Sequence, residues 1–236
     1  MKAIVLAAGL GTRLGAMTER LPKCLVEVAG KSVLRRNLEW AAANGVNEVA
    51  VNLHHRAPLV RGHFALEPAP LPVHWSHEPE LLGTAGTLHS LRDWVGEERF
   101  AVIYADNLIA CDLTALAALH VRRDARATVA LFEREDVSQS GVAELSFRDR
   151  IIRFVEKPAP GQSPSHWVSA GLIVFDAAVA QLAPARGDIG RDLLPTLLER
   201  GEHVAGYRMS QSETLHWIDT PDDLERTRSV FAGALG

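Results

Sequence analysis

The sequence predicts an α/β fold, with helices on both faces of an open, mainly parallel central sheet and a small mixed β extension in the second half. Apolar runs rich in β-branched residues, typical of strands buried on both faces, lie at Lys2–Ala8, Glu48–Leu53 and Phe100–Ala105. Segments with helical periodicity separate them, at Lys31–Asn44 and Thr84–Val95. Strands that alternate with helices in this way form a three-layer α/β/α arrangement.

The remaining elements follow in order along the chain. Leu113–Arg123 is expected to be a helix and Thr128–Glu133 a strand. The second half then changes to shorter β-like stretches joined by turns, which lie at Gly141–Phe147, Ile151–Val155 and Val168–Phe175. Near the end of the sequence, Thr220 as N-cap and Pro221 at the first helical position favour the start of a last helix.

Composition and charge exclude several classes of protein. The 236 residues carry a net charge of −4 and no basic excess, so we expect no nucleic-acid partner. No apolar run reaches the ~18 residues that a membrane helix needs, and we expect a cytoplasmic protein with no membrane partner. Cys24 and Cys111 lie far apart and follow no metal-ligand spacing, which is typical of reduced thiols.

A glycine-rich loop follows the first predicted strand and contains a single arginine. Its sequence lacks the lysine that a P-loop places after its last glycine. A dinucleotide-binding fingerprint is also disfavoured, because Leu14 stands at the third glycine position and Pro22 interrupts any long helix. This loop and Asp106 each follow the carboxyl end of a predicted strand. Such folds bind ligands at that edge of the sheet.

A third interpretation is a loop that wraps a nucleoside triphosphate, whereas a tight structural turn with solvated charges would account for the glycines alone. Glycines let the backbone approach a ligand closely, and successive amide groups then form an anion-binding concavity. Arg13 can bind two phosphate oxygens through its forked guanidinium group. Lys23, which follows shortly after the loop, supplies a compact positive charge for phosphoryl transfer.

A series of motifs resembles the sugar-1-phosphate nucleotidyltransferases, or NDP-sugar pyrophosphorylases, in the family's order along nearly the whole chain. The motifs are Leu6–Leu14 followed by Pro22-Lys23, Glu80–Leu88, Asp106, Glu156-Lys157-Pro158, Ser169-Ala170-Gly171 and Trp217–Pro221. The resemblance implies a Rossmann-like, GT-A-like fold in one domain over residues 1–236. Its nucleotide-binding half would cover about 1–135, and its sugar-binding half with the last helix about 136–236. Only one helix follows Pro221, so the β-helix domain of longer members is not expected.

The resemblance also implies the reaction and its residues. An NTP and a sugar 1-phosphate would give an NDP-sugar and pyrophosphate, with Mg²⁺ as cofactor. Arg13 and Lys23 would be catalytic, and Asp106 and Asp219 would bind the metal. The nucleotide would lie against Leu6, Ala8, Gly9, Gly11, Thr12, Arg13, Gly83, Thr84 and Ala85. The sugar phosphate would lie against Glu156, Lys157, Ser169 and Gly171.

The segment from Leu82 to Gly86 resembles the guanylyltransferases that act on mannose 1-phosphate or manno-heptose 1-phosphate, so GTP and a manno-configured acceptor are expected. Ser169 stands where the family commonly has a sugar-facing Asn, which leaves the acceptor open. Alternatives are transfer from UTP, dTTP or CTP to another phosphorylated acceptor, and a catalytically silent nucleotide-sugar-binding regulator. A homo-oligomer is compatible with either.

Simpler structural roles are compatible with several of these residues when each is taken alone. Asp106 also suits a turn after its strand, and Asp219 suits an acid beside a helix start. Glu156 and Lys157 are also compatible with a solvated surface pair.

Overall fold

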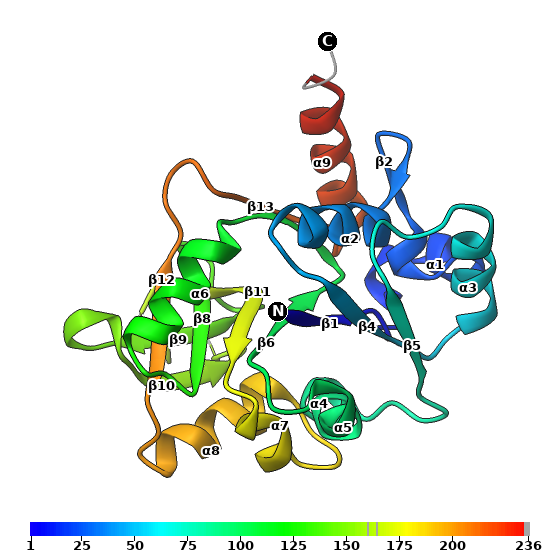
Figure 1. Cartoon of the computed structure of the whole chain (residues 1–236). Helices are drawn as coiled ribbons and strands as arrows, with labels where there is room; N and C mark the ends of the chain where they lie inside the picture. The colour runs from blue at the N-terminus through cyan, green and yellow to red at the C-terminus, as the bar shows by residue number, and fades with distance from the viewer. Residues whose placement is uncertain (160, 164, 234–236) are drawn as a thin grey trace. The chain divides into compact units, whose positions relative to one another are not determined.

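The computed structural model describes residues 1–159, 161–163 and 165–233. The chain forms two compact units, each assembled from separate stretches (Figure 1). Unit 1 contains Met1–Lys2, Leu82–Val102 and Asp112–Glu213, and unit 2 contains Ala3–Leu81, Ile103–Cys111 and Thr214–Gly236. The prediction of one domain with halves at about 1–135 and 136–236 stays a prediction.

Unit 2 is built around parallel strands at which the glycine loop begins. Strand β4 (Glu48–Leu53) lies between β1 (Lys2–Leu6) and β5 (Val73–His77), and β4 pairs with β5 in parallel from Val49 opposite Val73 to Leu53 opposite His77. Its helices include α1 (Ala16–Arg20), α2 (Val33–Ala43), α3 (Ala57–Leu66) and α9 (Pro221–Gly233), and two 3₁₀ turns lie at Thr12–Leu14 and Lys23–Leu25.

Two short antiparallel ribbons complete unit 2. Strands β2 (Glu27–Val28) and β3 (Lys31–Ser32) form one, and β7 (Asn107–Ala110) and β13 (Thr214–Trp217) form the other. Helix α9 lies beside β2, and the Arg228 side chain donates to the Glu27 carbonyl (Figure 1). A buried apolar cluster joins these parts; its members are Leu14, Val26, Val28, Val33, Leu108, Ile218 and Leu224.

Unit 1 contains the mixed β extension that the sequence predicts. Strands β9 (Gly141–Leu145), β10 (Ile151–Glu156) and β11 (Trp167–Phe175) pair antiparallel, and β8 (Ala127–Glu133) pairs antiparallel with β11 and parallel with β12 (Val204–Arg208). The helical segments of this unit are α4 (Gly83–Ser90), α5 (Arg92–Val95), α6 (Leu113–Arg122), α7 (Ala178–Leu182), a π-helix (Ile189–Leu193) and α8 (Leu194–Glu199). Strand β6 (Phe100–Tyr104) begins in unit 1 and ends in unit 2.

The expected strands and helices are confirmed to within a few residues at their ends, with one exception. Thr84–Val95 forms two helices, α4 and α5, and Leu91 lies between them with non-helical φ and ψ angles. Thr220 is confirmed as the start of α9: its hydroxyl accepts from the Asp223 amide at 3.2 Å, and the Asp223 carboxylate accepts from the Thr220 amide at 3.0 Å.

Several elements have no clear sequence signal. Strand β5 has the sequence VHWSH, which shows no apolar alternation. All of its residues are half-buried or exposed. The strands β7 and β13 are four residues each and form only by pairing with one another across a long stretch of sequence. Among the described residues, no helix combines the length and the apolar character needed to cross a membrane.

Candidate active site

The glycine loop of unit 2 is fixed at both of its ends by polar contacts. At its start, the Ala7 amide donates to the Asn52 side chain at 2.7 Å. At its end, the buried Thr18 hydroxyl bonds to the carbonyls of Gly11 and Gly15, each at 3.0 Å. Between these contacts, the amides of Gly9, Leu10 and Gly11 donate to no partner within the described residues. These free amides make the loop suitable for binding an anion.

Gly11 is the glycine that the loop requires for steric reasons. Its φ angle is +66°, which is unfavourable for a residue with a Cβ atom. A Cβ at this position would lie 2.9 Å from the Cβ of Lys23 and 3.0 Å from a methyl group of Thr18. The loop backbone therefore packs directly on the aliphatic part of Lys23.

Four charged side chains of unit 2 meet beside this loop. The Lys23 Nζ lies 2.6 Å from Asp219 Oδ1 and 3.3 Å from Asp106 Oδ2. The Arg13 guanidinium lies 3.0 Å from the same Asp219 oxygen. The Lys23 side chain is only 9% exposed, whereas that of Arg13 is 49% exposed. The structure thus brings together the two predicted catalytic cations and the two predicted metal ligands.

The pairing of β7 with β13 explains why the two aspartates meet. Trp217, the last residue of β13, lies opposite Asn107, the first residue of β7. Asp106 directly precedes β7, and the amide of the fully buried Ile218 donates to the Asp106 carbonyl at 3.2 Å. Asp219 follows Ile218 and therefore reaches the same place as Asp106.

The donor set suits Mg²⁺. The carboxylates of Asp106 and Asp219 both contact the cationic nitrogen of Lys23. The position between them therefore stabilises a positive charge. Within the described residues, no third His, Cys, Asp or Glu completes a protein-only metal cluster. Mg²⁺ is commonly held by one or two carboxylates together with waters and substrate phosphates, so this arrangement fits the ion.

A buried polar pair behind the loop is not among the residues predicted from the sequence. Asn52, at the end of β4, binds the Ala7 amide and also donates to the Glu78 carboxylate at 2.9 Å. Both side chains belong to buried residues, with 4% and 2% of their surface exposed. Asn52 therefore positions the start of the loop. An Asn inside an otherwise apolar strand is the signal that would have indicated it.

The predicted base-binding segment lies in unit 1, at the start of α4. The amides of Ala85 and Gly86 donate to the Gly187 carbonyl at 2.9 and 3.2 Å. Gly83 has a φ of +76°, and a Cβ there would lie 2.3 Å from that carbonyl oxygen. The Thr84 hydroxyl accepts from the Ile189 amide at 2.7 Å. The turn before the π-helix thus holds the segment through its backbone, and Ala85 is fully buried.

The predicted sugar-phosphate residues occupy neighbouring strands of unit 1. Glu156 on β10 lies opposite Gly141 on β9, and Ser169 on β11 directly follows the residue opposite Val142. A Cβ on Gly141 or Gly190 would lie 2.7 or 2.5 Å from Glu156 Oε2, so the absence of side chains there makes room for the carboxylate.

The surroundings of Glu156 shift the pKa of its carboxyl group upward. Burial raises the pKa of its carboxyl group, and Asp188 adds to this, whereas Lys157 and Arg191 lower it by a smaller amount. Lys157 is exposed, with a φ of +51°, and its amide donates to the Ser140 carbonyl at 3.0 Å. Gly171 lies at a register irregularity of β11, and its amide donates to the Ser169 hydroxyl at 3.3 Å.

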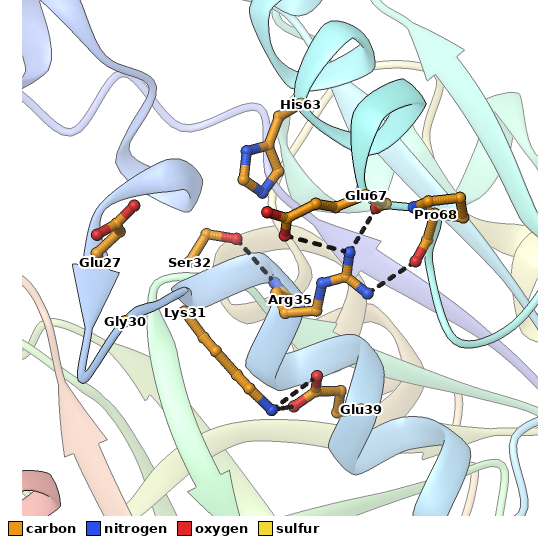
Figure 2. A pocket seen from close by; sticks show the side chains of 9 residues that line it. All are labelled: Glu27, Gly30, Lys31, Ser32, Arg35, Glu39, His63, Glu67 and Pro68. Carbon is orange, nitrogen blue, oxygen red and sulfur yellow. Dashed lines mark hydrogen bonds and ion pairs between the residues drawn. The ribbon is translucent and has the colours of Figure 1, made fainter.

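A pocket of about 440 Å³ in unit 2 contains none of the predicted site residues. Figure 2 shows that its Lys31 and Arg35 side chains have partners: Lys31 binds the Glu39 carboxylate at 2.8 Å, and Arg35 donates to the Pro68 carbonyl at 2.8 Å. Arg35 also contacts the Glu67 carbonyl. Because its cations are already bound, we do not assign a phosphate ligand to this pocket.

Comparison with known proteins decides the family. The sequence profile described as nucleotidyl transferase matches residues 2–225. The chain belongs to the nucleotidyl transferase family. Among curated relatives, it is 29% identical to a UTP–glucose-1-phosphate uridylyltransferase of Synechocystis sp. over 98% of the chain. It is 30% identical to a mannose-1-phosphate guanylyltransferase catalytic subunit beta of Dictyostelium discoideum over 84% of the chain. The resemblance to sugar-1-phosphate nucleotidyltransferases is confirmed.

Solved structures show the same fold. HddC from Yersinia pseudotuberculosis superposes with a TM-score of 0.83 at 22% identity, covering 98% of this chain and 99% of that one. A UDP-glucose pyrophosphorylase complexed with UDP-glucose superposes with a TM-score of 0.87 at 20% identity, covering 99% and 98%. The predicted α/β fold with a mainly parallel central sheet is confirmed. Among the curated relatives, the chain spans 64% of the Synechocystis protein and 56% of the Dictyostelium protein.

Proposed function

We propose that this nucleotidyl transferase moves a nucleoside monophosphate from an NTP to a sugar 1-phosphate, with GTP and a manno-configured acceptor as its substrates. A phosphate oxygen of the acceptor would form a bond to the α-phosphorus, and the bond between that phosphorus and the bridging oxygen to the β-phosphate would break. Pyrophosphate leaves with the electron pair. The observation that supports this most is the meeting of Lys23, Arg13, Asp106 and Asp219 beside the glycine loop.

The reaction needs charge stabilisation more than proton transfer. A sugar phosphate is already an anionic nucleophile near neutral pH, so no strong base is required at the attacking oxygen. Two polyanions must instead be brought together in line. Lys23 would stabilise the α-phosphate, and the exposed Arg13 would bind the β- and γ-phosphates and the leaving pyrophosphate. The free amides of Gly9 and Gly11 add further donors.

Asp106 and Asp219 would hold Mg²⁺, and this assignment rests on their convergence on one cation. When bound, the ion would neutralise charge on the phosphate oxygens. The segments that carry the two carboxylates are joined by the backbone hydrogen bond from the buried Ile218 to Asp106.

The acceptor is assigned to the residues of unit 1. Lys157 would bind its phosphate, and the half-buried Glu156 would bind sugar hydroxyls, as an acceptor when ionised and also as a donor when protonated. Ser169 and Gly171 would line the sugar. A serine leaves more room than the asparagine expected from the family. The identity of the sugar is therefore less narrowly defined by these residues than that of the nucleotide.

Transfer from UTP instead of GTP is a second candidate, and the relatives of the chain support it. The relatives include both a guanylyltransferase and a uridylyltransferase at nearly equal identity, 30% and 29%. The deciding experiment is pyrophosphate release with Mg²⁺ from each NTP against a panel of sugar 1-phosphates. Release from GTP with a manno-configured acceptor supports the proposal. Release from UTP, dTTP or CTP instead retains the reaction and changes the base, and no release from any pair favours a nucleotide-sugar-binding regulator.

Removing the charged groups tests their assignment. We expect Lys23→Ala and Asp106→Ala each to lower kcat by about 10²–10³, because each removes a charge that acts on the transferring phosphate. Steady-state kinetics with circular dichroism as a check on folding measure this. Lys31→Ala, which removes a lysine paired only with Glu39 in the described residues, is the matched control. A kcat near that of the unmodified protein in either variant would contradict the role of that residue.

A further inference from the structure

We propose that Lys23 is an internal counter-ion, which occupies the Asp106–Asp219 carboxylate pair until a triphosphate arrives. Uptake of a divalent cation at this pair would then depend on the nucleotide. The inference rests on the proposed function in one respect, the assignment of the two aspartates to the metal.

The geometry fixes Lys23 in this position. Its aliphatic part packs against the backbone of Gly11, and its residue is 8% exposed, so its stem has little freedom. Its Nζ binds both carboxylates, at 2.6 Å and 3.3 Å. Arg13 adds a second positive charge at 3.0 Å from Asp219. Two cations therefore neutralise two anions, and the carboxylates stay together without any other ion.

A divalent cation cannot bind these oxygens while the ammonium group remains there. Mg²⁺ requires ligand oxygens at about 2.0–2.1 Å, and Asp219 Oδ1 and Asp106 Oδ2 are the oxygens that already bind the Lys23 ammonium group. The Lys23 ammonium and the Arg13 guanidinium already share Asp219 Oδ1, so a divalent cation at this oxygen would meet the repulsion of two positive groups in a site that is partly shielded from water. The ammonium group and the metal therefore compete for the carboxylate pair.

A nucleoside triphosphate resolves this competition. Its phosphate oxygens offer new partners to Lys23 and Arg13, which then leave the carboxylates free for the metal. Lys23 exchanges one set of anionic oxygens for another, so its charge is never left buried without a partner. By linkage, the nucleotide must raise the affinity for the metal by the same factor by which the metal raises the affinity for the nucleotide.

The test measures metal binding without turnover. Mn²⁺, which is a paramagnetic substitute for Mg²⁺, is titrated into the full chain without nucleotide, and the free ion is followed by electron paramagnetic resonance. The variant is Lys23→Met, which keeps the aliphatic stem against Gly11 and removes the charge. Lys31→Met is the matched control. The double variant Lys23→Met with Asp106→Asn identifies the site that binds.

We expect Lys23→Met to bind Mn²⁺ alone about tenfold more tightly than the unmodified chain, because a charge-assisted hydrogen bond no longer competes. Lys31→Met should match the unmodified chain, and the double variant should lose the gain. Addition of a non-hydrolysable GTP analogue should raise Mn²⁺ affinity in the unmodified chain more than in Lys23→Met.

An unchanged or weaker affinity in Lys23→Met would overturn the proposal, as would a gain that survives in the double variant. If Lys23→Met fails to fold, Arg13→Gln gives the second test, because its half-exposed side chain binds the same Asp219 oxygen. A smaller tightening is expected there, and no tightening would overturn the proposal. Binding is measured apart from pyrophosphate release, so an active enzyme with unchanged Mn²⁺ binding would contradict this inference alone.

Discussion

Gly11 illustrates, at the scale of single residues, how one missing side chain determines a site. The glycines of the loop look alike in the sequence, but only Gly11 combines a positive φ with close neighbours. Gly15 also has a positive φ, of +62°, but a Cβ there would meet open space. Gly9 has neither constraint. Substitutions at the three positions therefore distinguish the cost of a positive φ angle from the cost of steric contact.

Alanine substitutions at these three positions should rank in a fixed order of stability. Gly9→Ala should change the free energy of unfolding little. Gly15→Ala should cost about 1 kcal/mol because of its φ angle, and Gly11→Ala should cost more, because its Cβ also displaces Lys23. Urea unfolding of the three variants measures this. Equal losses at positions 11 and 15 would show that contact with Lys23 is unimportant.

The raised pKa of Glu156 should make the stability of the protein depend on pH. Burial is the main cause that raises the pKa of its carboxyl group above the ordinary 4.5. Between the unfolded and the folded pKa, the folded state binds more protons, so this group lowers stability as pH rises through that interval. Glu156→Gln should therefore raise Tm at pH 7, and the gain should disappear as pH falls below about 4.5. Glu199→Gln, at an exposed position, is the control for loss of charge; a pH-independent gain would contradict this account.

Pairing between short elements brings the functional residues together at the scale of elements. The two aspartates meet because β7 pairs with β13, and the glycine loop is held because the end of β4 binds the residue after β1. Neither contact is local in sequence. The second depends on Asn52, which joins the Ala7 amide to Glu78 inside an apolar strand.

Removal of the Asn52 side chain should loosen the loop. We expect Asn52→Ala to lower the free energy of unfolding by about 1–3 kcal/mol, because it leaves buried polar groups without this partner. The KM for the NTP should rise more than kcat falls, because Asn52 positions the loop and does not touch the reacting atoms. Asn47→Ala, at an exposed position of the same unit, is the control. A selective loss of kcat would indicate a direct role instead.

The division into two units matters at the scale of the whole molecule, because the triphosphate and the acceptor are assigned to residues of different units, whereas the predicted base-binding segment Gly83–Ala85 belongs to unit 1. The proposed triphosphate residues Gly9–Arg13 and Lys23 belong to unit 2. The proposed acceptor residues Glu156 and Lys157 belong to unit 1. Each unit has its own buried strands. Protection of its amides from hydrogen exchange can therefore be measured separately.

Hydrogen exchange should separate the two substrates. A non-hydrolysable GTP analogue with Mg²⁺ should slow exchange most at residues 9–11, because the free amides of the loop gain partners. A sugar 1-phosphate alone should slow exchange near 156–157 in unit 1. Mass spectrometry of peptides from each unit measures both effects. Protection by the nucleotide analogue near the pocket lined by Arg35 and Glu39, and not in the loop, would contradict the assignment.

The sequence by itself determined the family, the α/β class and most buried elements, because apolar periodicity and the spacing of glycines and charges are local properties. It also placed Arg13, Lys23, Asp106 and Asp219 in one site by resemblance. Only the tertiary structure decided that Lys23 binds both aspartates, that Asn52 holds the loop and that Glu156 is wedged between two glycines. These contacts depend on pairing between distant segments, which no local pattern encodes.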